Sequence, residues 1–244
     1  MVDLGLNGLT ALVTGGAGGI GGAIVDALAR EGCNVAFCSR SEESVARKVQ
    51  SLSCHPVRAS GRALDALEPD GIDDWLAELG RIDIFVPTVS AIAPDLDATI
   101  AADIRATIMW TDRVLPYLRQ SEHAAITYIG SLGTRFAMPS NKAYGMAKAG
   151  MAHYMQSLSR ELAPEGIRVN VVSPGYVEIE GGTWSRWKTS HPAIYQAAVR
   201  NNPFGRLGRG DEIGKVAAFI SSPAASFVSG ADWFVDGASS LNCP

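Results

Sequence analysis

The sequence has few of the features that mark nucleic-acid-binding, membrane-spanning or secreted proteins. Only 19% of its 244 residues are charged, and the net charge is −4. No basic surface is therefore expected for a phosphate backbone, and nucleic acid is not an expected partner. The chain has no uninterrupted apolar run of about eighteen residues, and its first residues lack a basic stretch followed by an apolar one. We expect neither a membrane span nor a secretory leader.

Cysteine and histidine are also scarce, and their positions do not indicate a metal site. Cys33, Cys38, Cys54 and Cys243 show no ligand spacing, and His191 has no nearby cysteine or second histidine. Such cysteines are typical of reduced thiols in a cytoplasmic protein. We therefore predict a cytoplasmic protein without a metal ion.

What the sequence does contain is typical of one compact α/β domain. Hydrophobic residues make up 47% of the chain, and 26 glycines indicate many tight turns. A chain of this length can bury a large core within one domain. We predict a single domain over residues 1–244.

The segment from Ser131 to Lys148 carries a hydroxyl, a phenol and an ammonium group. Tyr144 and Lys148 are four residues apart in an Ala-rich helical pattern, so their side chains share one helix face. A free phenol has a pKa of about 10, and a neighbouring ammonium favours its phenolate form. The pair therefore suits proton transfer near neutral pH.

A serine extends this pair to three groups. Ser131 follows the apolar run 124–130, which predicts a buried strand that ends at a sheet edge. A Tyr-x-x-x-Lys pair alone is also common on ordinary helix surfaces. The strand-end serine, followed by Tyr144 and Lys148 at this spacing, resembles the active site of the short-chain dehydrogenase/reductase family. The resemblance implies that Ser131 holds the substrate oxygen, Tyr144 transfers the proton, and Lys148 assists Tyr144 and holds the nicotinamide ribose.

A glycine-rich stretch near the N-terminus has the context of a dinucleotide-binding loop. Residues 9–13 predict a buried strand, residues 14–22 are glycine-rich, and a helical pattern follows. Such a turn lets the backbone approach a phosphate at a helix N-terminus. The glycines fit both the general G-x-G-x-x-G pattern and the form that the family shows. The resemblance implies that the cofactor contacts Gly15, Gly16, Gly18, Gly19, Ile20 and Gly21.

The end of the next predicted strand, residues 34–38, bears on the choice of cofactor. Ser39 and Arg40 stand where an Asp would be expected to bind the ribose hydroxyl of NAD. An arginine can instead pair with the 2′-phosphate of NADP and stack on adenine. We favour NADP, with NAD as the alternative. The other interpretation of Arg40 is a solvated residue that caps the strand and has no role in cofactor binding.

Further cofactor contacts are implied only by the resemblance. Asp65, at the end of a third strand predicted over residues 62–65, would bind the adenine amino group. The main chain around Pro174, Gly175 and Val177 would contact the nicotinamide amide. Two segments depart from the family. After a fourth strand predicted over residues 82–86, the residues from Pro87 and Thr88 to Ser90 stand where Asn-Asn-Ala-Gly is usual, and Ile179 replaces a Thr. We expect the wall beneath the adenine ribose to be built differently.

Asp103 lies in a helix predicted over residues 99–119, where the family has an Asn. That Asn offers its main-chain carbonyl to a proton relay through the lysine, and Asp103 retains a main-chain carbonyl. Its carboxylate needs a partner if it is buried. It either pairs with Lys148 or is a solvated helix residue, and we favour the second interpretation.

The segment 180–209 is predicted to be a substrate lid. Residues 180–202 read as an irregular insert. Trp184, Trp187 and Tyr195 favour a bulky or apolar substrate surface. Three further residues could meet an anion or be solvated: Arg186, Lys188 and His191.

The alternation of strands and helices predicts a doubly wound Rossmann-type parallel sheet of about seven strands, in the order 3-2-1-4-5-6-7, with helices on both faces. The predicted function is reversible NADP-dependent hydride transfer between a secondary alcohol and a ketone. A catalytically inactive nucleotide-binding protein and a non-redox enzyme, such as a dehalogenase using the Ser/Tyr pair, remain as alternatives. Apolar faces on residues 99–119 and 142–163 predict a homo-oligomer, and the resemblance implies a homotetramer, with a dimer as the other state considered.

Overall fold

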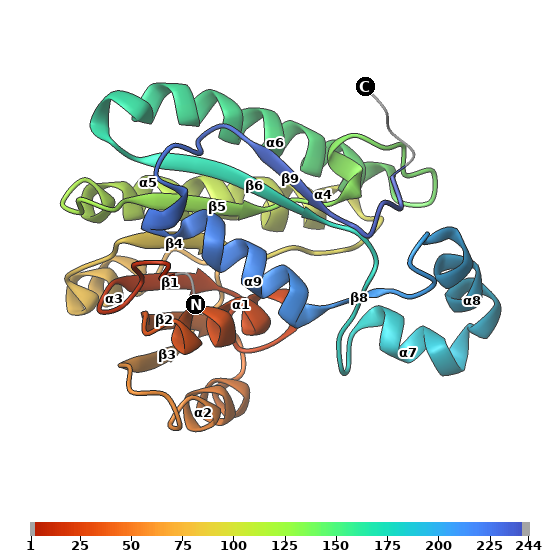
Figure 1. The fold of residues 1–244 in the computed structure, drawn as a ribbon, viewed down its shortest axis with the longest axis horizontal. Coiled ribbons are helices and arrows are strands. Elements are labelled where there is room, and N and C mark those ends of the chain that lie inside the picture. The colour runs from red at the N-terminus through yellow and green to blue at the C-terminus, as the bar shows by residue number, and fades with distance from the viewer. Residues whose placement is uncertain (1–2, 241–244) are drawn as a thin grey trace.

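A seven-stranded parallel sheet forms the centre of the computed structural model, which describes residues 3–240 (Figure 1). Its strands lie in the order β3-β2-β1-β4-β5-β6-β9, so the predicted order is confirmed. The strands are β1 (Thr10–Thr14), β2 (Asn34–Ser39), β3 (Ala59–Ala63), β4 (Ile84–Pro87), β5 (Ala125–Ile129), β6 (Arg168–Pro174) and β9 (Asp232–Val235).

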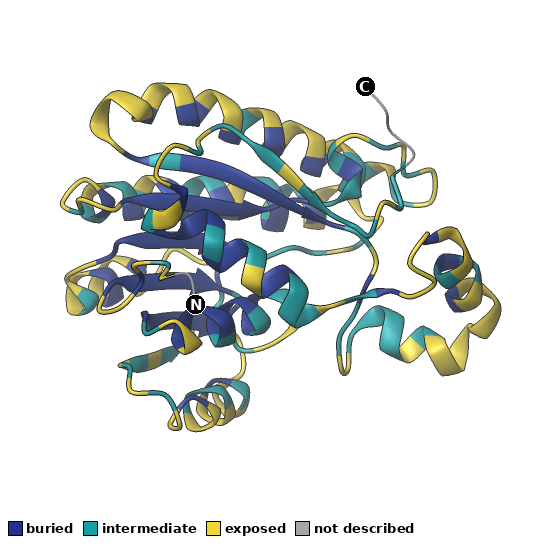
Figure 2. Ribbon diagram, viewed as in Figure 1, coloured by how far each residue is buried: buried dark blue, intermediate teal, exposed yellow. Residues whose placement is uncertain are grey.

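Helices cover both faces of the sheet, which explains why its central strands are buried along their whole length. Every residue of β1, β4 and β5 is buried. One face packs against α1 (Gly19–Arg30), α2 (Glu42–Ser51) and α9 (Gly210–Ser221), and the other against α3 (Ile72–Leu79), α5 (Ala106–Leu118) and α6 (Lys142–Leu162). Figure 2 shows the buried strands between partly exposed helices. The core therefore holds the carboxyl ends of the strands in fixed positions.

The helix predicted over residues 99–119 is interrupted by a wider turn. Residues 96–118 are helical throughout, but α4 (Leu96–Thr99) and α5 are joined by a π-helical segment, Ile100–Arg105. Such segments are rare and occur often at functional sites. Asp103 lies within this one.

The third strand lies closer to the N-terminus than the sequence predicted. It spans Ala59–Ala63 because it pairs with β2 from Val35 opposite Ala59 to Ser39 opposite Ala63. Gly61 permits that position, since a Cβ there would lie 2.5 Å from Val45 Cγ1. Asp65 therefore follows the strand instead of ending it.

The predicted lid is helical, so the prediction of an irregular insert was wrong. It contains α7 (Thr183–Ser190) and α8 (Pro192–Asn201), where Pro192 takes the first helical position that proline tolerates. The lid leaves the sheet through β7 (Val177–Glu178), which pairs with β8 (Gly208–Arg209). Tyr195, Ala198 and Leu207 form a small core of its own. Figure 1 shows α7 and α8 projecting beyond the sheet.

The cysteines that the structure describes are free thiols. Cys33 and Cys38 are buried, and burial raises the pKa of each thiol to about 12, so neither is reactive near neutral pH. Cys54 is exposed, and Cys243 lies outside the described residues. Within residues 3–240 no helix is both long and apolar enough to cross a membrane, and no cluster of three metal-binding side chains occurs.

Candidate active site

Ser131 lies just beyond the carboxyl end of β5. It begins a short 3-10 turn, Leu132–Thr134, and its hydroxyl accepts a hydrogen bond from the Gly133 N–H at 3.2 Å. The Thr134 hydroxyl lies 2.9 Å from the Ser131 carbonyl oxygen and 3.2 Å from an oxygen of Asp232 on β9. The turn that carries Ser131 is therefore tied to the neighbouring sheet.

Tyr144 and Lys148 lie on the first two turns of α6, close to that turn. Gly133 and Gly145 approach so closely that a Cβ on Gly133 would lie 3.3 Å from Gly145 Cα. The Lys148 Nζ is 5.6 Å from the centre of the Tyr144 ring. Tyr144 is half-buried, and Lys148 is only 3% exposed. The fold thus brings the serine turn, the phenol and the ammonium to one edge of the sheet.

Three groups of the protein surround the Lys148 ammonium. It donates hydrogen bonds to the Ile129 carbonyl at 2.9 Å and the Tyr128 hydroxyl at 3.1 Å, and it lies 3.3 Å from Asp103 Oδ1. Burial by itself would lower the pKa of Lys148, but the neighbouring Tyr128, Tyr144 and Asp103 outweigh it and raise that pKa. We therefore expect a protonated Lys148 over the physiological pH range.

The expectation that Asp103 is solvated was wrong. Asp103 is fully buried, and it forms the ion pair with Lys148 that was the other interpretation. Helical periodicity did not decide between the two interpretations, because the π-helical turn changes which side chains face the core. Tyr128, which also contacts Lys148, was not singled out from the sequence; its place in a strand that was predicted to be buried was the available signal.

The glycine-rich loop joins β1 to α1 in a form that a dinucleotide phosphate could approach. Gly15 and Gly19 have positive φ angles of 72° and 61°, and a Cβ on Gly21 would lie 2.5 Å from the Gly15 carbonyl oxygen. By contrast, Gly18 and Gly19 face open space. Within the described chain no side chain caps the N-terminus of α1, which leaves its first N–H groups free for an anion. Gly16 is packed against Phe37, and Ile20 against the core, so these two shape the loop.

Thr88 replaces the missing family residues beneath this loop. Its hydroxyl donates to the Thr14 carbonyl oxygen at 2.5 Å, and its N–H donates to the Thr14 hydroxyl at 3.2 Å. A Cβ on Gly21 would lie 2.6 Å from Thr88 Oγ1. The sequence identified this position as a departure from the family, but did not reveal that Thr88 supports the loop.

The predicted adenosine-binding residues lie at neighbouring strand ends. Ser39 ends β2 and is half-buried, and Arg40 follows it with an exposed side chain that has no hydrogen-bond or ion-pair partner in the described chain. Asp65 follows β3, and its carboxylate accepts the Leu67 N–H at 3.0 Å. Arg40 is thus free to meet a ligand.

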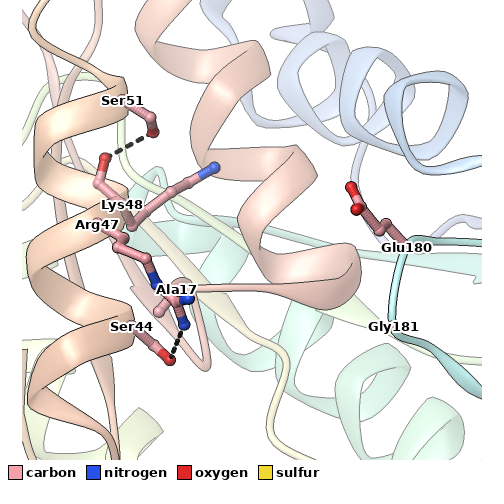
Figure 3. A pocket seen from close by; sticks show the side chains of 7 residues that line it. All are labelled: Ala17, Ser44, Arg47, Lys48, Ser51, Glu180 and Gly181. Atoms are coloured by element: carbon pink, nitrogen blue, oxygen red, sulfur yellow. Dashed lines mark hydrogen bonds between the residues drawn. The ribbon is translucent and has the colours of Figure 1, made fainter.

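A hollow of about 540 Å³ lies on the outer side of the glycine-rich loop (Figure 3). It extends from Arg47 and Lys48 on α2, past Ala17, to Glu180 at the start of the lid. Its charges are largely offset, because Arg47 pairs with Glu43 and Lys48 with Asp26. Ser131, Tyr144 and Lys148 do not line it, so it is not the reaction site.

The segment that follows β6 lies at the edge of the sheet formed by the carboxyl ends of the strands. Pro174 ends β6, and Gly175 passes so close to Asp236 that a Cβ would lie 2.8 Å from the Asp236 Cα. Val177 pairs with Gly208 in the short ribbon that leads into the lid. Ile179 packs against the core, so it offers a methyl surface where the family usually has the hydroxyl of a Thr.

An aromatic cluster and an ion pair lie in and beside the lid. Tyr176 and Trp184 lie 4.5 Å apart, and Trp187 lies 5.2 Å from Trp184 between ring centres. The prediction that Tyr195 lines the substrate surface was wrong, because Tyr195 is buried in the lid core and donates to Glu178 at 2.5 Å. Lys188 pairs with the same carboxylate, whereas Arg186 and His191 are exposed.

A family model described as enoyl-(acyl carrier protein) reductase matches residues 15–239. The chain belongs to the short-chain dehydrogenase/reductase family. It is 34% identical to an isoepoxydon dehydrogenase of Penicillium expansum, over 97% of this chain and 96% of that protein.

Solved structures of this family agree in fold. A short-chain dehydrogenase/reductase described as glucose/ribitol dehydrogenase from Brucella melitensis has a TM-score of 0.88 at 30% identity, over 99% of this chain and 100% of that one. The RhlG/NADP complex of Pseudomonas aeruginosa also has a TM-score of 0.88, at 28% identity and the same coverage. As a short-chain dehydrogenase/reductase, the protein is an oxidoreductase acting on CH–OH or C=O groups with a nicotinamide dinucleotide.

Proposed function

We propose that the protein catalyses reversible hydride transfer between NADP and a secondary alcohol or ketone that is bulky or apolar near the reacting carbon. The observation that carries this proposal is the meeting of the Ser131 turn, the Tyr144 phenol and the buried Lys148 ammonium at the carboxyl ends of the strands. Ligands of doubly wound sheets bind at this edge.

Each residue has one task in this reaction. The nicotinamide, when bound, supplies or takes up the hydride. Tyr144 donates a proton to the carbonyl oxygen during reduction and accepts it from the alcohol during oxidation. Ser131 donates a hydrogen bond to the same oxygen. Lys148 stabilises the phenolate that Tyr144 becomes when it gives up its proton.

The adenosine end supports NADP over NAD. Arg40 is exposed and has no partner within residues 3–240, so its guanidinium can pair with a 2′-phosphate. Ser39 lies beside it, and the N-terminus of α1 offers free N–H groups for the pyrophosphate. The related RhlG structure is an NADP complex. NAD is the alternative, because the glycine-rich loop itself carries no Arg or Lys.

The aromatic cluster at the lid supports the proposal of an apolar substrate. Tyr176, Trp184 and Trp187 form a continuous aromatic surface at the entrance to the lid, and such surfaces favour planar or bulky apolar groups. We extend the proposal to a cytoplasmic homo-oligomer, a tetramer or a dimer. Exposed apolar side chains on α4 and α6, Leu96 and Met146, support that extension, and light scattering of the purified protein tests it.

The experiment that tests this function is a titration of the protein with NADPH and NADH, followed by turnover. The five tryptophans report binding by fluorescence, and loss of NADPH absorbance reports turnover with a panel of aliphatic and aromatic ketones. Tighter binding of NADPH and turnover of bulky ketones are expected. Tighter NADH binding would overturn the NADP assignment, and binding without turnover of any ketone or alcohol would favour a catalytically inactive protein.

A further inference from the structure

The carboxylate of Asp103 is fully buried and each of its oxygens faces a donor. Oδ2 accepts the Ala91 N–H at 3.1 Å. Oδ1 lies 3.3 Å from Lys148 Nζ in an ion pair, and within the described residues it accepts no hydrogen bond. The side chain thus links the loop after β4 to α6, and among residues 3–240 Lys148 is the cation that pairs with its negative charge.

The Lys148 ammonium has three N–H donors and three facing acceptors in the chain. Two of these acceptors, the Tyr128 hydroxyl and the Ile129 carbonyl, are neutral. Both Lys148 and Tyr128 are almost completely buried. Asp103 is therefore the group that supplies a full negative charge to a cation that has little contact with water.

We propose that the Asp103 carboxylate is the counter-ion that keeps Lys148 charged and oriented beside Tyr144, and that Asp103 is thus a positioning residue of the active site. This inference rests on the proposed function. The inference assigns a role to the side chain of Asp103, whereas the resemblance implied a role for its main-chain carbonyl alone.

An Asn at this position could not do the same work. An amide has one acceptor oxygen and one donor nitrogen, whereas the Ala91 N–H and the Lys148 ammonium both require an acceptor. Whichever way the amide turns, it presents N–H groups to one of these two donors. Only a carboxylate of this size accepts from both sides.

The surrounding charges agree with this role. Burial alone would lower the pKa of Lys148, and the groups that face it raise the pKa instead: Tyr128 from β5, Tyr144 from α6 itself and Asp103 from the π-helical segment. Burial raises the pKa of the Tyr128 phenol, so this partner carries no negative charge at neutral pH. Removal of the Asp103 charge therefore leaves a buried ammonium among neutral partners, a setting that lowers a lysine pKa by several units.

The first test measures the pH dependence of kcat/KM for Asp103→Asn relative to the wild type. We expect the ratio of variant to wild type to fall about tenfold between about pH 6 and pH 9, because Lys148 loses its proton in the variant and keeps it in the wild type. Tyr128→Phe removes only a neutral partner and should move the ratio less. A ratio for Asp103→Asn that does not change with pH would overturn the inference.

Asp83→Asn is the matched control. Asp83 is equally buried and accepts from the Thr10 N–H and Arg81, but it lies at the amino end of β4, away from the site. Its replacement should lower the unfolding midpoint and leave the shape of the pH profile unchanged. If Asp83→Asn altered the profile as much as Asp103→Asn, the effect would reflect general loosening of the fold and the inference would fail.

A second test needs no activity. In urea unfolding of Asp103→Asn, Lys148→Met and the double variant, we expect the double variant to be more stable than Asp103→Asn alone, because it no longer contains an uncompensated buried charge. Stability losses that simply add would show that the two charges are not coupled. If the two substitutions are coupled but the wild-type protein reduces no ketone, the proposed function would be rejected and the ion pair would still be established.

Discussion

Lys148 and Arg40 lie on either side of strands β1 and β4, and their surroundings differ. Lys148 is 3% exposed, and the chain itself supplies its three partners. Arg40 is exposed, and the described residues provide it with no partner. At the proposed catalytic centre the interactions are part of the fold, whereas at the proposed adenosine end the described residues leave Arg40 available for a ligand.

This difference indicates where a substitution should act. A change near Lys148 alters both the free energy of unfolding and the chemistry, because a buried charge loses its partner or its environment. A change at Arg40 alters ligand binding alone, because the side chain contributes little to the folded state. The predictions below test this contrast between the two ends, beginning with the largest expected effect.

Tyr144→Phe should have the largest effect at the catalytic centre. We expect kcat to fall by about 10²- to 10⁴-fold, because the proton donor is removed, while the dissociation constant for NADPH changes little. Steady-state kinetics and a fluorescence titration measure the two quantities. Tyr154→Phe, further along the same helix and packed against the core, is the control and should retain its turnover; a Tyr144→Phe enzyme with most of its activity would refute the role of the phenol.

Arg40→Ala should act on binding of one cofactor only. The loss of a charge-assisted pair with the 2′-phosphate should weaken NADPH binding by about 10- to 100-fold and leave NADH binding unchanged. Arg47→Ala, which removes an exposed cation already paired with Glu43, is the matched control and should change either affinity by about twofold or less. Equal losses for both cofactors in Arg40→Ala would contradict the assignment of the phosphate site.

Thr88→Val should affect both cofactors to the same extent, because Thr88 supports the loop that binds the part they share. Loss of the hydrogen bond to the Thr14 carbonyl oxygen should raise the dissociation constants for NADPH and NADH by about three- to tenfold each. Parallel titrations measure the two constants. A selective effect on NADPH would place Thr88 with Arg40 at the adenosine end instead.

The smallest expected effect is a pH dependence that comes from the ligand. A phosphomonoester gains its second negative charge at a pKa of about 6, so NADPH affinity should rise by about two- to threefold between about pH 5 and pH 7. NADH affinity should stay constant over this range, and Arg40→Ala should remove the dependence. Binding isotherms at fixed ionic strength provide the measurement, and an equal rise for NADH would assign the dependence to the protein.

The local patterns of the sequence predicted the α/β sheet and the strand-end positions of Ser131 and Arg40, because buried strands, glycine turns and helical periodicity are visible over short stretches. The sequence-based predictions were less accurate where packing between distant elements determines the bounds of a strand or helix. The register of β3 depended on its pairing with β2, and the two lid helices depended on a core shared with Leu207. Neither contact is visible in a short window of sequence.

Local patterns in this chain were sufficient for the α/β fold, because buried strands, glycine turns and helix faces form over short distances. The Ser131, Tyr144 and Lys148 set was proposed from its resemblance to the active site of the family. The tertiary structure decided that Asp103 is buried, that it pairs with Lys148, and that Tyr128 and Thr88 join the site. These contacts form between elements distant in sequence. A buried carboxylate is stable only where another element supplies its counter-charge, and in this protein α6 supplies it.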